Sequence, residues 1–256
     1  MHHIRIFAII VSLLFLPQRA ALASEVTVMV SGGFSGALNA LATQYEKETG
    51  NSVIIVRGPS MGADPTSIPA RLSHGQRADV VILVRGALIQ LAEQHVVDIN
   101  SVKDLGVGLV AMAVRSGAPR PDIGTVAALK RALLNANSVA YSDSASGIYL
   151  STTLFKRLGI SHTMTAKSKM IQATPVGLII ARGDYELGFQ QLSELKGIPG
   201  IDIVGVIPEE VQQRTTFSAG LVTDALNPVG GSSLINFLSS PKAQPGIQAS
   251  GLALVH

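Results

Sequence analysis

Strand-like and helix-like segments alternate along most of this chain, and this alternation restricts the fold more than any other feature. Residues 25–30 (EVTVMV) alternate polar and apolar side chains, and residues 34–50 carry apolar residues at helical spacing up to Gly50. Residues 51–57 and 78–84 are further strands, each followed by a helical segment, at 64–75 and 86–97. The pattern predicts an α/β fold with a mainly parallel sheet flanked by helices.

The second half of the chain repeats this alternation. The pattern predicts helices at 125–136, at the segment after residue 144 and at 230–240, and strands at 106–115, 138–142, 187–191, 200–207 and 216–223. A chain of this length with two runs of βα units favours two lobes joined by two crossing strands that serve as a hinge. We expect lobe 1 to be discontinuous, at 24–107 and 218–256, and lobe 2 to span 108–217.

The first 23 residues have the pattern of an export signal. Arg5 precedes an apolar run at 6–16, and Ala21–Ala23 matches a small-residue cleavage site. The run is too short to span a membrane, so we expect no stable membrane insertion. The sequence predicts a cleaved signal peptide, with cleavage near Ala23/Ser24, and a periplasmic protein.

Composition excludes several classes of chemistry. The absence of cysteine excludes disulfides, thiolate catalysis and cysteine metal sites. The histidines are scattered without metal-ligand spacing, so no metal site is expected. Without the leader, basic and acidic residues nearly balance and form no basic stripe, which argues against nucleic acid as a partner. Nucleotide-binding glycine motifs are missing at the turns, and no cofactor is predicted.

Three loops of small residues each follow a strand and precede a helix: residues 31–33 (SGG), 59–62 (PSMG) and 144–147 (SASG). Such loops converge on the ligand crevice of open α/β sheets. Their backbone N–H groups and the positive helix ends suit an anion. Each loop alone could also be a plain connection, and Ser60 could simply cap the helix that follows it.

Two further pairs of polar residues are candidates for ligand contact. Gln190 and Gln191 end an apolar strand, where adjacent amides need either local partners or a ligand. Arg57 and Arg85 follow strands, and they either face an anion or end in solvent.

Several longer motifs resemble the molybdate-binding-protein-like branch of type II periplasmic binding proteins. They are VTVMVSGGFSGALNALATQYEKETG, ADVVILV, SGIY and ARGDYELGFQQLSEL. The resemblance covers nearly the whole mature chain and implies two hinged α/β lobes, with an oxyanion held by hydroxyls and backbone amides. It places Ser60 at the position of a serine that binds the oxyanion in that family. It also places Gly32 and Gly33 in the first ligand-binding loop and Ser146 in the third.

Two departures argue against molybdate: Gln191 replaces a tyrosine of the pattern, and Gly33 replaces a serine. The motifs PSMG followed by IPARL, VAYSDSASGIYLS and GFQQLSELKGIPGIDIVGVIP are instead similar to those of bacterial aconitate isomerases, which are built on this scaffold. This resemblance implies a periplasmic enzyme that interconverts trans- and cis-aconitate without a cofactor. The alternative is a non-catalytic solute-binding protein of an ABC importer for an oxyanion or organic acid, and only that alternative implies a permease partner.

The expected ligand is a tricarboxylate or another small anion. Its predicted contacts are Ser31, Gly32, Gly33, Ser60, Met61, Ser144, Ala145, Ser146, Gly147, Val176, Gln190 and Gln191. An allylic 1,3-proton shift also needs an acid–base group. We expect Asp143 in this role, since it is normally anionic at neutral pH, with Tyr149 next and Glu194 third. The alternative for Asp143 is a cap or turn former.

Overall fold

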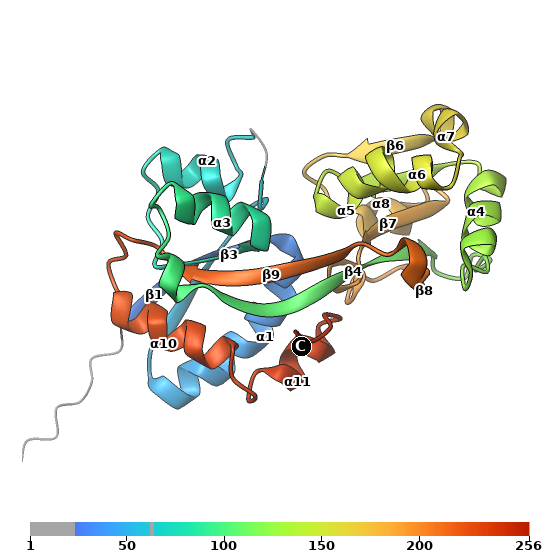
Figure 1. Cartoon of the computed structure of the whole chain (residues 1–256). Helices are drawn as coiled ribbons and strands as arrows, with labels where there is room; N and C mark the ends of the chain where they lie inside the picture. The colour runs from blue at the N-terminus through green and yellow to red at the C-terminus, as the bar shows by residue number, and fades with distance from the viewer. Residues whose placement is uncertain (1–23, 62–63, 256) are drawn as a thin grey trace, which may run out of the picture.

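The strands form one nine-stranded sheet. The computed structural model describes residues 24–61 and 64–255, and Figure 1 shows the arrangement of the elements. The strand order is β2-β1-β3-β9-β4-β7-β5-β6, and β8 pairs with β4 off this path. The strands are β1 (Glu25–Val30), β2 (Ser52–Arg57), β3 (Val80–Val84), β4 (Lys103–Arg115), β5 (Val139–Ser142), β6 (Ser168–Ile171), β7 (Leu187–Gln191), β8 (Ile201–Val206) and β9 (Arg214–Leu221).

Helices connect most of these strands, as the alternation predicts. The α-helices are α1 (Gly32–Thr49), α2 (Ile68–Ser73), α3 (Arg85–Glu93), α4 (Val126–Asn135), α5 (Ala145–Tyr149), α6 (Phe155–Arg157), α7 (Ser161–Lys167), α8 (Val176–Arg182), α9 (Leu192–Leu195), α10 (Pro228–Leu238) and α11 (Gln244–Ala249). Short 3-10 helices are η1 (Ile99–Ser101) and η3 (Glu209–Val211), and η2 (Leu150–Leu154) is a π-helical turn between α5 and α6.

The sheet is parallel in two regions and antiparallel where these regions are joined. β1 pairs in parallel with β2 and β3, and β5 pairs in parallel with β6 and β7. The pairs β3–β9, β4–β9, β4–β7 and β4–β8 are antiparallel. In Figure 1, β4 and β9 run side by side from the part that holds α1, α3 and α10 to the part that holds α4–α8. The two predicted crossing strands are therefore present, and they make the sheet mixed.

The hydrophobic core is divided in the same way. One large cluster takes all its buried members from residues 110–211, around β5, β7 and α4. Two others take theirs from residues 26–105 and 217–252. The exact lobe boundaries at 107/108 and 217/218 remain a proposal, because β4 and β9 run through both.

Local signals explain where helices begin and end. Gly50 ends α1 in the left-handed region, with φ 73°, which a residue without a Cβ adopts at little cost. The Ser67 side chain accepts a hydrogen bond from the Ala70 N–H at the start of α2 (3.4 Å). Asn227 caps α10 by accepting from the Gly230 N–H (2.9 Å).

Candidate functional site

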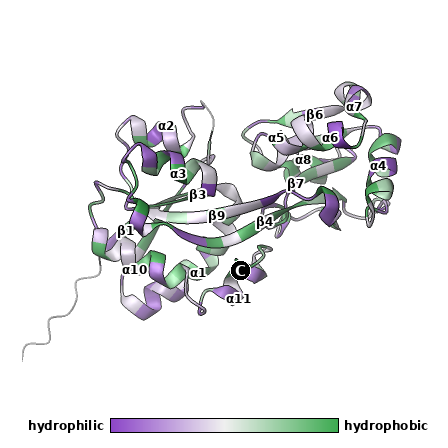
Figure 2. Cartoon of the chain, viewed as in Figure 1, coloured by the Kyte–Doolittle hydropathy of each residue, from purple (hydrophilic) through white to green (hydrophobic). Residues whose placement is uncertain are grey.

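A cavity of about 800 Å³ lies across β9, between the start of α3 and the helical segment α5–η2. Its wall includes Val84 and Arg85 from the β3–α3 turn, Ala145 and Tyr149 from α5, and the stretch 213–216 that enters β9. In Figure 2 this beginning of β9 is hydrophilic. The cavity thus brings together segments that lie far apart in the sequence, among them predicted site residues.

The second predicted loop is fixed to the end of β3. The buried Ser60 hydroxyl accepts a hydrogen bond from the Val84 N–H at 3.1 Å, and Met61 lines the cavity. The alternative role of Ser60 as the cap of α2 is wrong, because Ser67 has that position. A serine hydroxyl that accepts a hydrogen bond still carries one O–H donor, so Ser60 retains the ability to bind an anion.

The third predicted loop contains three hydroxyls in mutual contact. Ser142 Oγ lies 2.8 Å from Ser144 Oγ and 3.1 Å from Ser146 Oγ, and the latter two are 3.2 Å apart. Sequence reasoning missed Ser142, the last residue of β5. Gly147 is required beside it, because an added Cβ would lie 1.6 Å from the Ser142 carbonyl oxygen. This close approach of α5 to β5 gathers the three hydroxyls.

Asp143 and Tyr149, the first two candidates for the proton-moving group, have partners inside the protein. Asp143 is exposed, and its Oδ2 accepts a hydrogen bond from the Ala173 N–H at 3.0 Å. Ala173 has a positive φ of 52°, so this contact holds a strained loop. The buried Tyr149 hydroxyl donates to the Val211 carbonyl at 2.6 Å. These contacts support loop-holding roles for both residues.

The first predicted loop opens the long helix α1. Ser31 occupies the N-cap position without a side-chain capping bond, and its buried Oγ has no hydrogen-bond partner among the described residues. A Cβ added to Gly33 would lie 2.2 Å from Phe217 Cζ on β9, so no side chain fits there. The first N–H groups of a helix also lack partners within the helix. A buried hydroxyl and unpaired N–H groups therefore meet at this helix end.

Gln190 and Gln191 are both buried, and each has a partner inside the protein. Gln190 Oε1 accepts from the Val176 N–H at 2.9 Å, which gives that predicted ligand group an internal partner. Gln191 Nε2 donates to Thr215 Oγ1 at 3.2 Å, and Thr215 lines the cavity. Gln191 Oε1 is buried and has no hydrogen-bond partner in the described part of the chain.

Glu194 lies where the first loop meets these two amides. A Cβ added to Gly32 would lie 2.3 Å from Glu194 Oε1, so the carboxylate rests directly against the start of α1. Burial raises the pKa of Glu194 to about 7; the Gln190 side chain and the Gln191 N–H oppose this shift, and the charge of Asp143 adds to it. A carboxyl group that titrates near neutral pH is suited to acid–base work.

Two arginines on the cavity wall each have an acidic neighbour. Arg85 pairs with Asp104, and Arg214 pairs with Glu209 at 2.9 Å. Both guanidinium groups are about half exposed, so they can also offset the charge of an anion in the cavity. Arg57 is not part of this wall as far as the structure describes it.

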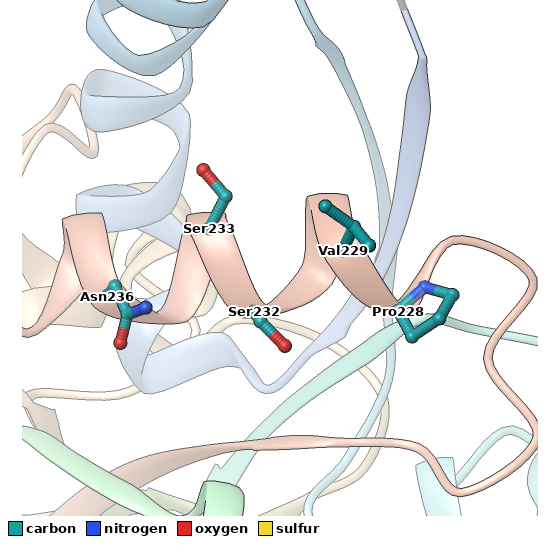
Figure 3. A pocket seen from close by; sticks show the side chains of 5 residues that line it. All are labelled: Pro228, Val229, Ser232, Ser233 and Asn236. Carbon is teal, nitrogen blue, oxygen red and sulfur yellow. The ribbon is translucent and has the colours of Figure 1, made fainter.

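A second hollow lies on the outside of α10 (Figure 3). All five of its residues come from this helix, and Figure 3 shows Ser233 pointing away from Ser232 and Asn236. Its lining carries no titratable group among the described residues, and it includes none of the predicted site residues. The cavity at β9 is therefore the better candidate site.

Two kinds of feature are absent from residues 24–61 and 64–255. These residues contain no group of three or more acidic, histidine or cysteine side chains placed to hold a metal ion. They also contain no helix that is long and apolar enough to cross a membrane.

Comparisons with known proteins agree with this architecture. The chain is 48% identical over 229 residues to an aconitate isomerase from Pseudomonas sp, which covers 90% of this chain and 87% of that protein. It is 26% identical to the molybdate-binding protein ModA of Azotobacter vinelandii, over 92% of both chains. The solved periplasmic molybdate-binding protein of Azotobacter vinelandii superposes with a TM-score of 0.73 at 21% identity, over 90% of this chain and all of that one.

These likenesses confirm the predicted type II periplasmic binding protein fold. The family described as bacterial extracellular solute-binding protein matches residues 26–253, nearly all of the chain that the structure describes. The chain belongs to this family of bacterial extracellular solute-binding proteins.

Proposed function

We propose that this protein is an aconitate isomerase, which interconverts trans- and cis-aconitate by a 1,3-proton shift without a cofactor. The observation that carries the proposal is the 48% identity, over 90% of the chain, to the Pseudomonas aconitate isomerase. The candidate site supports it, because it combines groups that bind carboxylates with an acid that titrates near neutral pH.

The substrate is a tricarboxylate, and the site offers donors for several carboxylate groups. The start of α1 supplies unpaired N–H groups at Gly32 and Gly33, together with the buried Ser31 hydroxyl. The hydroxyl cluster of Ser144 and Ser146, with Ser142, lies at the start of α5. Arg85 and Arg214 offset part of the negative charge.

The same donors serve the chemistry. When a proton leaves the carbon next to a carboxylate, negative charge spreads onto the carboxylate oxygens. Hydroxyl and N–H groups that already point at these oxygens stabilise this charge without having to reorganise. An isomerase therefore needs the kind of donor arrangement that a solute-binding protein uses for an anion, together with one group that moves the proton.

The second candidate function is that of a non-catalytic solute-binding protein for an organic acid or oxyanion. The family description and the molybdate-binding relatives favour it. Under this alternative the partner would be the permease of an ABC importer. Both functions fit a periplasmic location, which rests on the predicted signal peptide at residues 1–23, outside the described residues.

One experiment separates the two functions. Purified protein is incubated with trans-aconitate in D₂O and followed by ¹H NMR, and its melting temperature is measured with trans-aconitate and with molybdate. An isomerase forms cis-aconitate, whose proton signals appear as those of trans-aconitate decline. Stabilisation by a ligand without turnover would instead identify a binding protein.

A further inference from the structure

The reaction proposed above leaves open which group of the protein moves the proton. We propose that Glu194 is the catalytic base, and that its carboxylate carries one proton from the methylene carbon of aconitate to the vinyl carbon at the other end of the allylic unit. This inference rests on the proposed function.

Glu194 has the required position. Its carboxylate rests against Gly32, in the first turn of the 18-residue helix α1. A side chain at position 32 would occupy this space, since a Cβ there would lie 2.3 Å from Glu194 Oε1. The neighbouring Ser31 Oγ is buried and unpartnered among the described residues. A substrate carboxylate bound at the Ser31 hydroxyl would therefore bring its adjacent carbon next to Glu194.

Glu194 is also held in place by groups that are themselves fixed. The Gln190 side chain and the Gln191 N–H lie close enough to its carboxylate to lower its pKa. Gln190 Oε1 is bound to the Val176 N–H at 2.9 Å, which leaves its NH₂ group to face Glu194. Gln191 reaches Thr215 on the cavity wall at 3.2 Å. The two glutamines of β7 that face the carboxylate are thus themselves fixed by α8 and β9.

The two other candidates are less well placed. The Tyr149 hydroxyl donates to a buried carbonyl of Val211, and Asp143 accepts the Ala173 N–H in an exposed loop. Glu194 alone among the three combines contact with the first loop and partial burial. Its pKa of about 7 means that the base and acid forms are both well populated at neutral pH, as one group that takes and returns a proton requires.

The proton and the electrons balance with this single group. The Glu194 carboxylate takes a proton from the methylene carbon, and the C–H electron pair spreads over the three allylic carbons and the carboxylates at both ends. The resulting Glu194 carboxylic acid returns the proton to the former vinyl carbon. The double bond moves by one position, and no proton is gained or lost overall.

The first test compares three variants for turnover of trans-aconitate and for binding by calorimetry. We expect Glu194→Gln to lose at least about a hundredfold in kcat while it still binds trans-aconitate, as for other general bases. Asp143→Asn removes a charge that raises the pKa of Glu194, and it should lose much less in kcat than Glu194→Gln. Glu210→Gln, at an exposed glutamate, is the matched control. Near-normal turnover by Glu194→Gln, or a hundredfold loss confined to Asp143→Asn, would overturn the proposal.

The second test uses the wild-type protein and does not depend on the folding of a variant. Trans-aconitate deuterated at its methylene carbon is converted in H₂O, and the first cis-aconitate formed is examined by NMR and mass spectrometry. Deuterium at the new methylene carbon supports a single carrier, because the half-buried Glu194 is shielded from exchange with water. Initial product without any transferred deuterium would rule out the single carrier. Wild-type protein without any turnover would refute the proposed function itself.

Discussion

At the scale of single residues, Glu194 links the stability of the protein to pH. Its pKa is about 7 in the folded protein, against an ordinary value of 4.5. The folded state therefore holds a proton that the unfolded chain releases between these values. The stabilising contribution is complete below about pH 4.5 and is lost as the pH rises through 7.

We therefore predict that Glu194→Gln becomes more stable relative to wild type as the pH is raised from about 5 to 8. The expected gain is about 2 kcal/mol, since one pKa unit is worth about 1.4 kcal/mol and the half-buried side chain retains some solvation. Urea unfolding at several pH values measures it, with Glu210→Gln as the control. A stability difference that does not change with pH would mean that Glu194 titrates at its ordinary pKa.

Gly147 is a second residue whose role can be measured. A Cβ at this position would lie 1.6 Å from the backbone oxygen of Ser142, which no side-chain movement can relieve. We predict that Gly147→Ala lowers the free energy of unfolding by about 3 kcal/mol or more. Gly86→Ala, in α3, is the control: its Cβ meets nothing within 4 Å, so that variant should be neutral or slightly stabilised. Equal stability of the two variants would contradict the close contact.

The sequence predicts which loops form the site better than it predicts which atoms act there. Loops of small residues after strands can be recognised in the sequence, and two of the three, at Ser31 and Ser144, open helices of the fold. The position of Glu194 against Gly32 depends on contact between α9 and the start of α1, about 160 residues apart, which no local pattern encodes. Ser142 was missed for a related reason, because only the tight approach of Gly147 brings its hydroxyl to Ser144 and Ser146.

At the scale of elements, the sequence predicts the segments with strong hydrophobic periodicity and misses short segments that bury few apolar side chains. Helix α7 and strand β6 at residues 161–171 escaped prediction: α7 buries only Met164, and β6 is a short edge strand. The six-residue helix α11 buries only Ile247. The antiparallel pairing of β9 with β3 and β4 could not be predicted either. Hydrophobic periodicity identifies a strand but does not show which strands will pair with it.

The segment between β2 and α2 contains two serines with different expected roles: Ser60 is a predicted substrate contact, and Ser67 caps α2. We predict that Ser60→Ala weakens binding of trans-aconitate by about 1–3 kcal/mol, because a hydrogen bond to a charged group is lost. Ser67→Ala should instead lower stability by about 1 kcal/mol, because α2 loses its cap, with little change in affinity. Calorimetry and thermal unfolding of both variants test this. Unchanged affinity of Ser60→Ala would remove Ser60 from the substrate site.

At the scale of the whole molecule, the two-lobed architecture follows from the sequence because each run of βα units builds its own core. Three core clusters take all their buried members from residues 110–211, and two take theirs from residues 26–105 and 217–252. Because the chain returns through β9, residues 217–252 share a core cluster with residues 26–105. The relative placement of the two parts depends on β4 and β9, whose paired residues lie about a hundred positions apart in the sequence.

This arrangement predicts that the protein closes around its ligand. The proposed contacts come from both sides of the crossing strands, Ser31 and Arg85 from one and Ser144 and Ser146 from the other, and strand pairs of this kind permit hinge motion. Solution scattering should therefore show a smaller radius of gyration at saturating trans-aconitate. Glu194→Gln should close as wild type does, because closure depends on carboxylate binding and not on proton transfer. A Ser144→Ala, Ser146→Ala double variant should close less at the same ligand concentration. An unchanged radius of gyration for saturated wild-type protein would show that the ligand binds without closure.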